Sequence, residues 1–258
     1  MNYGFHLATS GVVTGMRRLD TIANNLANAM TVGFKADYLN LEARQAENLE
    51  NGGLYPDANR ALDALGGGSL FKPTGIDLRQ GALRDTSRNL DVAIEGDGFL
   101  LLQPSGADSR DALVTRAGAL VRDTQGRLAL AGSGQLVQGI NGQPISLDPE
   151  QPDVVIDSDG RVLQSGLEVG RLSLVVPTDK SNLRKEGRDI MRILGGQTTP
   201  APASTTLRQG ALEESTVDPV MALADLVRVS RGIEFSTKLM QYQDQMTGRL
   251  VDTFGRFA

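Results

Sequence analysis

The side chains whose types and spacing could support chemistry are two groups of carboxylates beside predicted tight turns. The groups are Asp91, Glu95 and Asp97, and Asp153, Asp157 and Asp159. Two carboxylates facing each other across a cleft could hydrolyse a glycosidic bond, and closely spaced acids could bind calcium. However, the DSDG sequence at 157–160 lacks the third acid and the distal glutamate of a calcium-binding loop. We therefore interpret both groups as hairpin turns.

No other residues complete a recognisable site. His6 is the single histidine and lies in the first turn of a predicted helix, and the chain has no cysteine. No GxSxG sequence accompanies the histidine, and no GK[ST] follows the GDG or GSG sequences, as a phosphate-binding loop would need. The sequence therefore predicts no catalytic residue, no metal site and no cofactor, and it favours a non-enzymatic function.

The composition excludes several classes of partner. The net charge of −5 provides no basic surface for nucleic acid. No apolar run approaches the ~20 residues of a membrane-spanning helix. The first residues, MNYGFHLATSGVV, lack the basic and apolar regions of a cleaved secretory signal. We expect no binding to nucleic acid, no membrane insertion and no cleaved signal peptide.

A long amphipathic helix is predicted at the N-terminal end, over residues 3–28. Phe5, Val12, Leu19 and Leu26 recur every seven residues and form an apolar stripe along one side. The residues between them are often small, as close packing against another helix would need. Gly33 follows an Asn-rich last turn, at a position suited to end such a helix.

A second long helix is predicted over residues 219–252. Leu226, Ile233 and Met240 recur every seven residues, and Leu223 supports them one turn earlier. Asp218 is a good N-cap, and the following proline occupies the first helical position, where its missing N–H has no cost.

Short strands are predicted between the two helices. Alternating apolar residues occur in NLDVAIEGDGFLLL, and the hairpin sequences VRDTQGRLAL at 121–130 and VIDSDGRVLQ at 155–164 each place an acid and a glycine at a turn. The run LEVGRLSLVVPT predicts one further strand. This spacing is typical of a small β-barrel or β-sandwich.

These patterns together predict an α+β fold, in which terminal helices form a coiled-coil-like layer and the middle domain is all β. The predicted segments are an N-terminal helical assembly segment at 1–44, an irregular region at 45–77, a β-rich body at 78–194, a flexible linker at 195–206, and a C-terminal strand with a helical assembly segment at 207–258. The apolar helix stripes have two possible explanations. The helices could pair with each other as a hairpin on the body, or they could bundle with helices of neighbouring subunits.

The most distinctive sequence is ANNLANAMTVGFK, at residues 23–35. Asn24, Asn25 and Asn28 form a polar ridge beside the apolar stripe, which predicts either a solvated helix end or amides that tie neighbouring helices together. This stretch resembles the ANNLANxxTxGFK signature of the flagellar hook–basal-body axial proteins. LDVAIEGDGF, TRAGAL with DTQGRL, QGALEESTVDPV and RGIEFSTKLM resemble further family segments in the family's order, so the resemblance covers nearly the whole chain.

The resemblance implies a structural subunit that stacks into the torque-transmitting rod of the basal body, across the periplasm. Its partners would be copies of itself, other flagellar rod and hook subunits, and the flagellar export apparatus. We predict that residues of the signature and the helix stripes lie at subunit interfaces. They are Phe5, Val12, Leu19, Ile22, Asn24, Asn25, Leu26, Asn28, Thr31, Gly33, Phe34, Lys35, Leu223, Leu226, Ile233, Glu234 and Met240.

The sequence LRQGAL occurs twice, at 78–83 and at 207–212. We interpret the two copies as the chain's crossings from the helical layer to the β body and back. Gly81 and Gly210 would then allow a bulge or a close approach of the backbone.

Some residues depart from the family pattern. Met30 stands where the family often has Asn, and Gly232, Ile233 and Phe235 replace more usual residues. The length of 258 residues is short for a hook subunit and favours a rod subunit of the FlgF or FlgG type. No clear long stretch of the distal (FlgG) form is present in 45–77, which favours the proximal (FlgF) form. A hook-type subunit, an extracellular fibre or adhesin, and a carbohydrate-active protein remain as alternatives.

Overall fold

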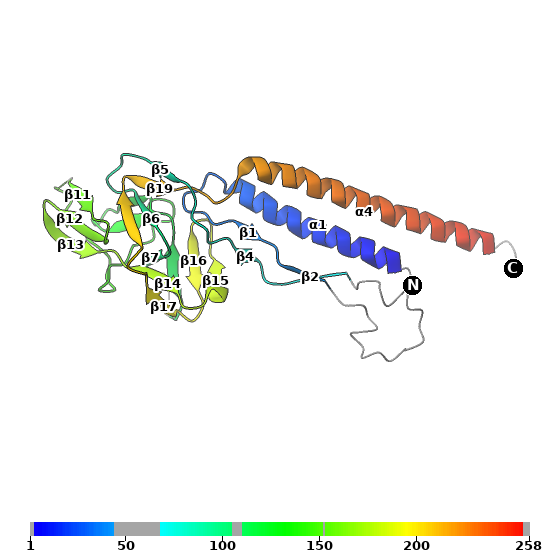
Figure 1. Cartoon of the computed structure of the whole chain (residues 1–258), viewed down its shortest axis with the longest axis horizontal. Helices are drawn as coiled ribbons and strands as arrows, with labels where there is room; N and C mark the ends of the chain where they lie inside the picture. Colours follow the sequence, from blue (N-terminus) through cyan, green and yellow to red (C-terminus); the bar gives the residue numbers. More distant parts are fainter. Residues whose placement is uncertain (1–2, 44–67, 105–109, 152, 255–258) are drawn as a thin grey trace. The chain divides into compact units, whose positions relative to one another are not determined.

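The computed structural model describes residues 3–43, 68–104, 110–151 and 153–254. Its contacts divide the chain into two units (Figure 1). The helical unit contains Met1–Ala27, Asp37–Asp77 and Asp218–Ala258, and the β unit contains Asn28–Ala36 and Leu78–Val217. The chain thus passes between the units after Ala27, Ala36, Asp77 and Val217. The fold is α+β, with a helix towards each end of the chain and a β-rich middle, as predicted.

The helical unit is built on two long helices that lie side by side (Figure 1). They are α1 at Tyr3–Ala27 and α4 at Pro219–Phe254, which confirms the helices predicted at 3–28 and 219–252. The Asp218 carboxylate accepts hydrogen bonds from the backbone N–H groups of Val220 at 2.9 Å and Met221 at 3.1 Å. These bonds satisfy two of the donors that a helix start leaves free. Within the described part of the chain, no helix combines the length and apolarity needed to span a bilayer.

A narrow antiparallel ribbon completes the helical unit. β1 at Asp37–Tyr38 pairs with β4 at Gly75–Ile76, and β2 at Leu41–Ala43 pairs with β3 at Ser69–Phe71. The guanidinium of Arg17 on α1 lies 6.0 Å from the centre of the Phe71 ring, close enough for a cation–π contact. The sequence predicted an irregular region over 45–77. Residues 45–67 of this stretch lie outside the described residues, and two- or three-residue strands are too short to show a period in the sequence.

The β unit contains several antiparallel sheets. The largest has the strand order β15-β16-β8-β7-β14-β17, a second has the order β11-β12-β13, and β10-β9, β18-β6 and β19-β5 form two-stranded pairs. The strand bounds are β5 Leu83–Asp85, β6 Val92–Glu95, β7 Phe99–Leu102, β8 Ala112–Thr115, β9 Leu120–Arg122, β10 Leu128–Leu130, β11 Val154–Ile156, β12 Arg161–Gln164, β13 Leu167–Arg171, β14 Leu174–Pro177, β15 Leu183–Lys185, β16 Ile190–Ile193, β17 Thr198–Pro200, β18 Thr206–Gln209 and β19 Ala211–Glu213, and the 3₁₀ helix η1 spans Lys180–Asn182. No sheet among the described residues closes into a barrel, since β15 and β17 each pair with one neighbour only.

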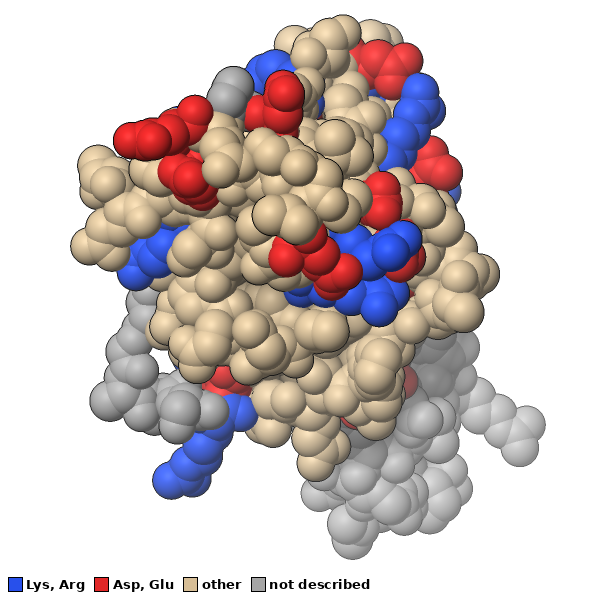
Figure 2. Space-filling model, turned by 90° about the vertical axis from the view of Figure 1, so that its left-hand side faces the viewer, with Lys and Arg blue, Asp and Glu red and all other residues tan. Residues whose placement is uncertain are grey.

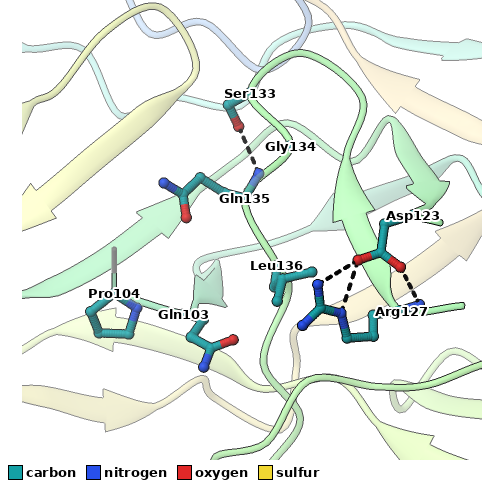
Figure 3. A pocket seen from close by; sticks show the side chains of 8 residues that line it. All are labelled: Gln103, Pro104, Asp123, Arg127, Ser133, Gly134, Gln135 and Leu136. Carbon is teal, nitrogen blue, oxygen red and sulfur yellow. Dashed lines mark hydrogen bonds and ion pairs between the residues drawn. The ribbon is translucent and has the colours of Figure 1, made fainter. Parts of the chain in front are cut away.

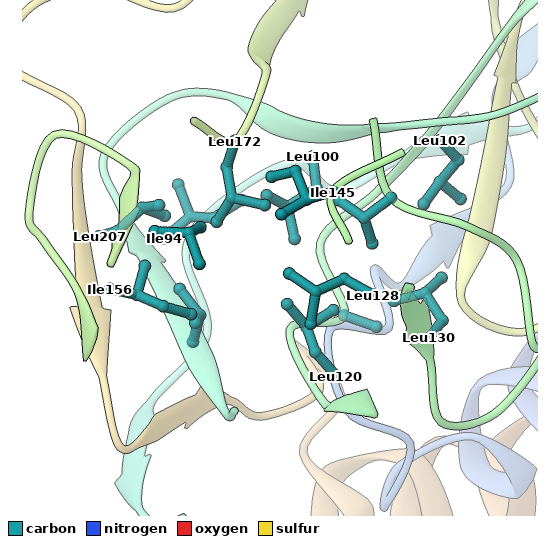
Figure 4. Close-up of a cluster of buried hydrophobic side chains, with 14 of the residues drawn as sticks. Ile94, Leu100, Leu102, Leu120, Leu128, Leu130, Ile145, Ile156, Leu172 and Leu207 are labelled. Carbon is teal, nitrogen blue, oxygen red and sulfur yellow. The ribbon is translucent and has the colours of Figure 1, made fainter. Parts of the chain in front are cut away.

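The core of the β unit is aliphatic (Figure 4). Ile94, Leu100, Leu120 and Leu128 are fully buried and come from β6, β7, β9 and β10, while Leu172 joins them from the connection between β13 and β14. Small and branched side chains from many short strands fill this core, in a chain of which aromatic residues make up only 4%. Burial of each such side chain stabilises the fold by roughly 1.5–3 kcal/mol.

The two hairpins predicted at 121–130 and 155–164 are confirmed as β9–β10 and β11–β12. Gly126 and Gly160 have φ values of +82° and +86°, which residues with a side chain rarely adopt. The Asp123 carboxylate accepts hydrogen bonds from the backbone N–H groups of Gln125 and Arg127, both at 2.8 Å, and so fixes the first turn.

Two other regions differ from the sequence expectations. LEVGRLSLVVPT forms β13 and β14 rather than one strand, because the chain leaves the three-stranded sheet near Leu172 and joins the six-stranded one. Within 195–206, which the sequence predicted to be a flexible linker, Thr198–Pro200 form the edge strand β17 against β14. An edge strand can pair through its backbone while its polar side chains remain exposed, so composition gives little indication of it.

Candidate assembly surfaces and a buried ion cluster

The two long helices pack closely because α1 presents glycines to α4. A Cβ atom on Gly15 would lie 2.5 Å from Cγ1 of Ile233, and one on Gly11 would lie 3.2 Å from Oγ of Ser236. Gly4 likewise faces Gln243. Because these positions carry no side chain, the α4 side chains can reach the backbone of α1. The glycines therefore define a close seam between α1 and α4 within one chain.

The predicted apolar interface residues fall into two groups around this seam. The first group lies on the same helix faces as Gly15 of α1 and Ile233 of α4, because its members are whole helical turns away from them, and it is half-buried. Its members are Val12, Leu19, Ile22, Leu26, Leu226, Ile233 itself and Met240. Phe5, Leu223 and Glu234 are exposed. The structure thus gives most of the heptad residues a contact within the chain.

A second row of apolar side chains runs along α4 away from the seam and is exposed in the chain by itself. We call it the outer stripe; its members are Phe235, Leu239, Tyr242, Met246 and Leu250, which follow one another at intervals of three or four residues. Phe235 is 66% exposed and Tyr242 64% exposed. Large apolar side chains gathered on one helix face indicate a surface that another protein covers. None of these residues was predicted from the sequence, because they lie outside the register of Leu226, Ile233 and Met240.

The Asn-rich end of α1 makes contacts within the chain. The Asn25 amide donates to the Asp37 carbonyl at 2.7 Å and accepts from the Asp37 N–H at 2.8 Å. The Asn24 amide donates to the Asp37 carboxylate at 3.2 Å. These asparagines therefore hold β1 beside the last turns of α1, which explains why residues of poor helix propensity occur there.

The rest of the signature belongs to the β unit. Asn28 is buried and accepts a hydrogen bond from the half-buried Thr31 at 3.2 Å. Gly33 has φ +67°, and a Cβ there would lie 2.5 Å from the backbone nitrogen of Ala117. The Phe34 side chain is 1% exposed, and the Lys185 ammonium lies 3.7 Å from its ring centre. These contacts fix the segment in the β unit.

Lys35 ends the signature in a buried ion cluster formed with Arg116 and Glu213. The Lys35 ammonium donates to Oε1 of Glu213 at 2.5 Å and to the Arg79 carbonyl at 2.6 Å. Arg116 donates to Oε2 of Glu213 at 3.2 Å. All three charged side chains are at most 2% exposed. The two cations therefore share the single carboxylate of Glu213.

Arg116 is held by more than the ion pair. Its guanidinium donates to the Gly96 carbonyl at 2.7 Å and lies 5.2 Å from the centre of the Phe99 ring. Burial lowers the pKa of Arg116, while the charge and hydrogen bond of Glu213 act in the opposite direction. The loss of one member of such a buried pair typically costs about 3–5 kcal/mol, because the remaining charge has no partner.

The two LRQGAL copies meet at this cluster. Leu83, at the end of the first copy, is the register partner of Glu213, which follows the second copy. The Gly81 N–H donates to Oε1 of Glu213 at 2.8 Å, and a Cβ on Gly81 would overlap the Glu214 carbonyl oxygen. Gly210 lies between β18 and β19 with φ +74°. One glycine thus permits close backbone contact and the other permits a sharp change of direction.

The carboxylates considered for catalysis do not form an acid–base pair. Asp91 is buried in the β unit, Glu95 lies 3.9 Å from Arg208, and Asp159 forms ion pairs with Arg161 and Arg171. The described residues contain no cluster of three or more potential metal ligands. These acids therefore occupy structural positions.

Figure 3 shows a hollow lined by polar side chains elsewhere in the β unit. Among the described residues that line it, the carboxylate is that of Asp123, which is bonded to Arg127 at 2.7 Å and to the backbone of the β9–β10 turn. The hairpin therefore already occupies this carboxylate.

The charged surface of the β unit is mixed. On the face shown in Figure 2, basic and acidic side chains lie beside one another. The ion pairs of Arg192 with Glu186 at 2.7 Å and with Asp111 at 3.3 Å likewise place opposite charges next to each other. The face in Figure 2 therefore has no continuous basic patch of the kind that binds nucleic acid.

The roles of Glu213, Arg116 and Asp37 were not predicted from the sequence. Glu213 stands in a polar run, and its partner Lys35 is 178 residues away in the chain. Opposite charges at such separation carry no local pattern. An indirect signal was present, because LRQGAL and TRAGAL both adjoin the residues that form the cluster.

Comparison with protein families gives three matches in chain order. Residues 7–35 match the family described as flagella basal body rod protein, residues 93–164 match the flagellar hook protein FlgE/F/G D1 domain, and residues 208–253 match the flagellar basal body rod FlgEFG protein C-terminal family. The first match covers most of α1 and the signature, the second lies within the β unit, and the third covers most of α4.

Curated relatives match over nearly their full length. The chain is 30% identical to the flagellar basal-body rod protein FlgF of Caulobacter vibrioides, with 99% of each chain covered. It is 32% identical to FlgF of Escherichia coli, over 96% of this chain and 97% of the relative. It is 28% identical to the rod protein FlgG of Caulobacter vibrioides, over 93% of this chain and 94% of the relative. The chain therefore belongs to the flagellar basal-body rod protein family that includes FlgF and FlgG.

Proposed function

We propose that this protein is a structural subunit of the bacterial flagellar rod, and that it polymerises through its terminal helices into the shaft that transmits torque. The names of its full-length relatives support a structural rather than enzymatic role. The observation that carries the polymerisation proposal is the outer stripe of α4, which is exposed in the single chain. When copies of the chain assemble, they would bury this stripe, and removing its apolar surface from water would stabilise the assembly.

The paired helices supply a preformed layer for this assembly. Since Leu19, Ile22, Leu226 and Ile233 are half-buried in the monomer, neighbouring subunits would contact mainly the exposed residues of the helical unit. Among the residues predicted from the sequence, we propose Phe5, Leu223 and Glu234 for such contacts. The signature residues around Lys35 would then act indirectly, by fixing the segment 28–36 within the β unit.

The proposed location is the basal-body rod, where the chain would contact other rod and hook subunits after passage through the flagellar export apparatus. Within the family, we propose an FlgF-like, proximal position. Two relatives from Caulobacter vibrioides support this assignment: identity and coverage are higher for FlgF, at 30% and 99%, than for FlgG, at 28% and 93%. An FlgG-like, distal position is the second choice.

Phe235→Asp tests the proposal when the variant gene replaces the native gene in a motile strain. The side chain is 66% exposed, so the monomer should retain its fold, while a charge on the outer stripe should prevent helix packing between subunits. We expect loss of swimming and loss of complete basal bodies. Gln241→Asp places the same charge on an exposed polar position of α4 and should leave swimming intact.

Purified Phe235→Asp protein must also show the helical content and unfolding midpoint of the parent chain. Normal swimming of the Phe235→Asp strain would refute assembly through the outer stripe. Equal loss of swimming with Gln241→Asp would point instead to a general intolerance of acidic charge on α4.

A further inference from the structure

Glu213 has bonds to each segment through which the chain enters or leaves the β unit. Its side chain binds Lys35, one residue before the chain passes out after Ala36, and the Gly81 N–H, four residues after the chain returns past Asp77. Glu213 itself lies four residues before the final exit at Val217. A single carboxylate therefore joins three stretches of chain that are far apart in sequence.

Backbone hydrogen bonds reinforce the same three stretches. The Gly33 N–H donates to the Glu213 carbonyl and the Glu214 N–H donates to the Ala82 carbonyl, both at 2.8 Å. The Thr216 N–H donates to the Phe34 carbonyl at 3.1 Å. The amide hydrogens of Gly33, Gly81, Glu214 and Thr216 are thus all held at the cluster, and we call them the junction amides.

Arg116 connects this junction to the interior of the β unit. It binds Glu213 on one side and the carbonyl of Gly96, beyond β6, on the other. If Glu213 lost its charge, the buried cations Lys35 and Arg116 would both lose the carboxylate that they share. All three stretches would lose stability from that one change.

We propose that Glu213 is a clasp that makes the entering and leaving segments of the β unit open and close as one cooperative element. In this arrangement no single segment can detach while the others stay in place, because the three share one buried carboxylate. The clasp holds together the segments at the boundary of the β unit. This proposal is independent of the proposal that other subunits cover the outer stripe of α4.

Hydrogen exchange of the full-length protein, read residue by residue by NMR, tests the clasp. In the parent chain the four junction amides should exchange with one common protection factor, as members of one cooperative unit do. Glu213→Gln keeps the size of the side chain and removes its charge, and it should lower the protection of all four amides by about 100-fold. The amides of Leu101 and Val137, which are bonded to backbone carbonyls elsewhere in the β unit, should keep their protection.

Glu214→Gln is the matched control. Glu214 is the next residue, but its carboxylate pairs at the surface with Arg84 at 3.0 Å and is 49% exposed. Its removal should change the protection of the junction amides by less than about threefold, since an exposed pair contributes little.

Lys35→Met provides an independent test if Glu213→Gln fails to fold, because it leaves Glu213 paired with Arg116. A cooperative clasp requires that all four junction amides lose protection together in this variant. A loss confined to Gly33 and Thr216 would show that the segments open independently and would overturn the proposal. An equal loss at Leu101 and Val137 would also overturn it, because the cluster would then only support the stability of the whole unit.

Discussion

At the scale of single residues, Gly33 shows how one position can be fixed by two constraints at once. Its φ of +67° disfavours any residue with a Cβ, and the space around it is filled by the backbone of Arg116 and Ala117. The sequence identified Gly33 as a position suited to end a helix. Its second constraint comes from residues more than 80 positions away, which a local pattern cannot reveal.

We predict that Gly33→Ala lowers the free energy of unfolding of the β unit by at least about 2 kcal/mol, because left-handed strain and steric overlap add together. Gly142→Ala is the control, since Gly142 has φ +75° but nothing within 4 Å of the position of its Cβ. It should lose only the strain energy, about 1 kcal/mol. Urea unfolding of both variants measures the difference, and equal losses would contradict the steric part of this explanation.

At the scale of elements, the structure separates what local sequence specifies from what it does not. The ends of α4 and the two hairpins were predictable because caps and turn glycines act within a few residues, as Asp218 and Gly126 do here. The choice of partner for α1 was not predictable. A period of seven fits a helix pair within one chain as well as a bundle of several chains, and only the contact of Gly15 with Ile233 identifies the first.

The same limit applies to the outer stripe and to β17. Phe235 and Tyr242 lie outside the register of the predicted apolar stripe, and they can be identified only when the structure shows which face of α4 is already covered. Thr198–Pro200 form a strand through backbone pairing with β14, for which their side chains give no sign. Partners that are distant in sequence thus decide both features.

The seam between α1 and α4 yields a prediction about Gly15. Gly15→Val should push Ile233 away, separate the helices and make α4 more sensitive to protease, because a Cβ alone would already lie 2.5 Å from Cγ1 of that residue. Gly232→Ala is the control, since its Cβ would meet nothing within 4 Å. It should stabilise the helix by about 0.5–1 kcal/mol. Limited proteolysis read by mass spectrometry compares the two, and equal cleavage of α4 would argue against a close seam.

At the scale of the whole molecule, the boundary between the units falls at the end of α1, inside the family signature. Residues 28–36 follow the helix in sequence, yet they belong to the β unit and bury Phe34 and Lys35 there. The family signature therefore spans both units. Asn24 and Asn25 bind β1 in the helical unit, while the Gly-Phe-Lys sequence belongs to the β unit.

This division predicts the behaviour of two fragments. A fragment of residues 28–217 should unfold at a clearly higher urea concentration than a fragment of residues 37–217, because only the first retains Phe34 and Lys35. The loss of a buried Phe side chain alone typically costs about 3–5 kcal/mol. Denaturation followed by circular dichroism makes the comparison. Equal midpoints would mean that the signature contributes nothing to the β unit.

The distance along the chain between Lys35 and Glu213, 178 residues, bears on how an incomplete copy is recognised. Ribosomes deliver the N-terminal end first, so both cations are present long before their shared anion. A product that stops before residue 213 must either leave these cations in water, with the surrounding core open, or bury them without the carboxylate that they share, at a cost of several kcal/mol. In both cases the incomplete chain is less stably folded than the full chain and is cleaved more readily by proteases. The ion cluster thereby distinguishes complete from incomplete copies, because the segment around Lys35 can be buried stably only after Glu213, in the last fifth of the chain, has been synthesised.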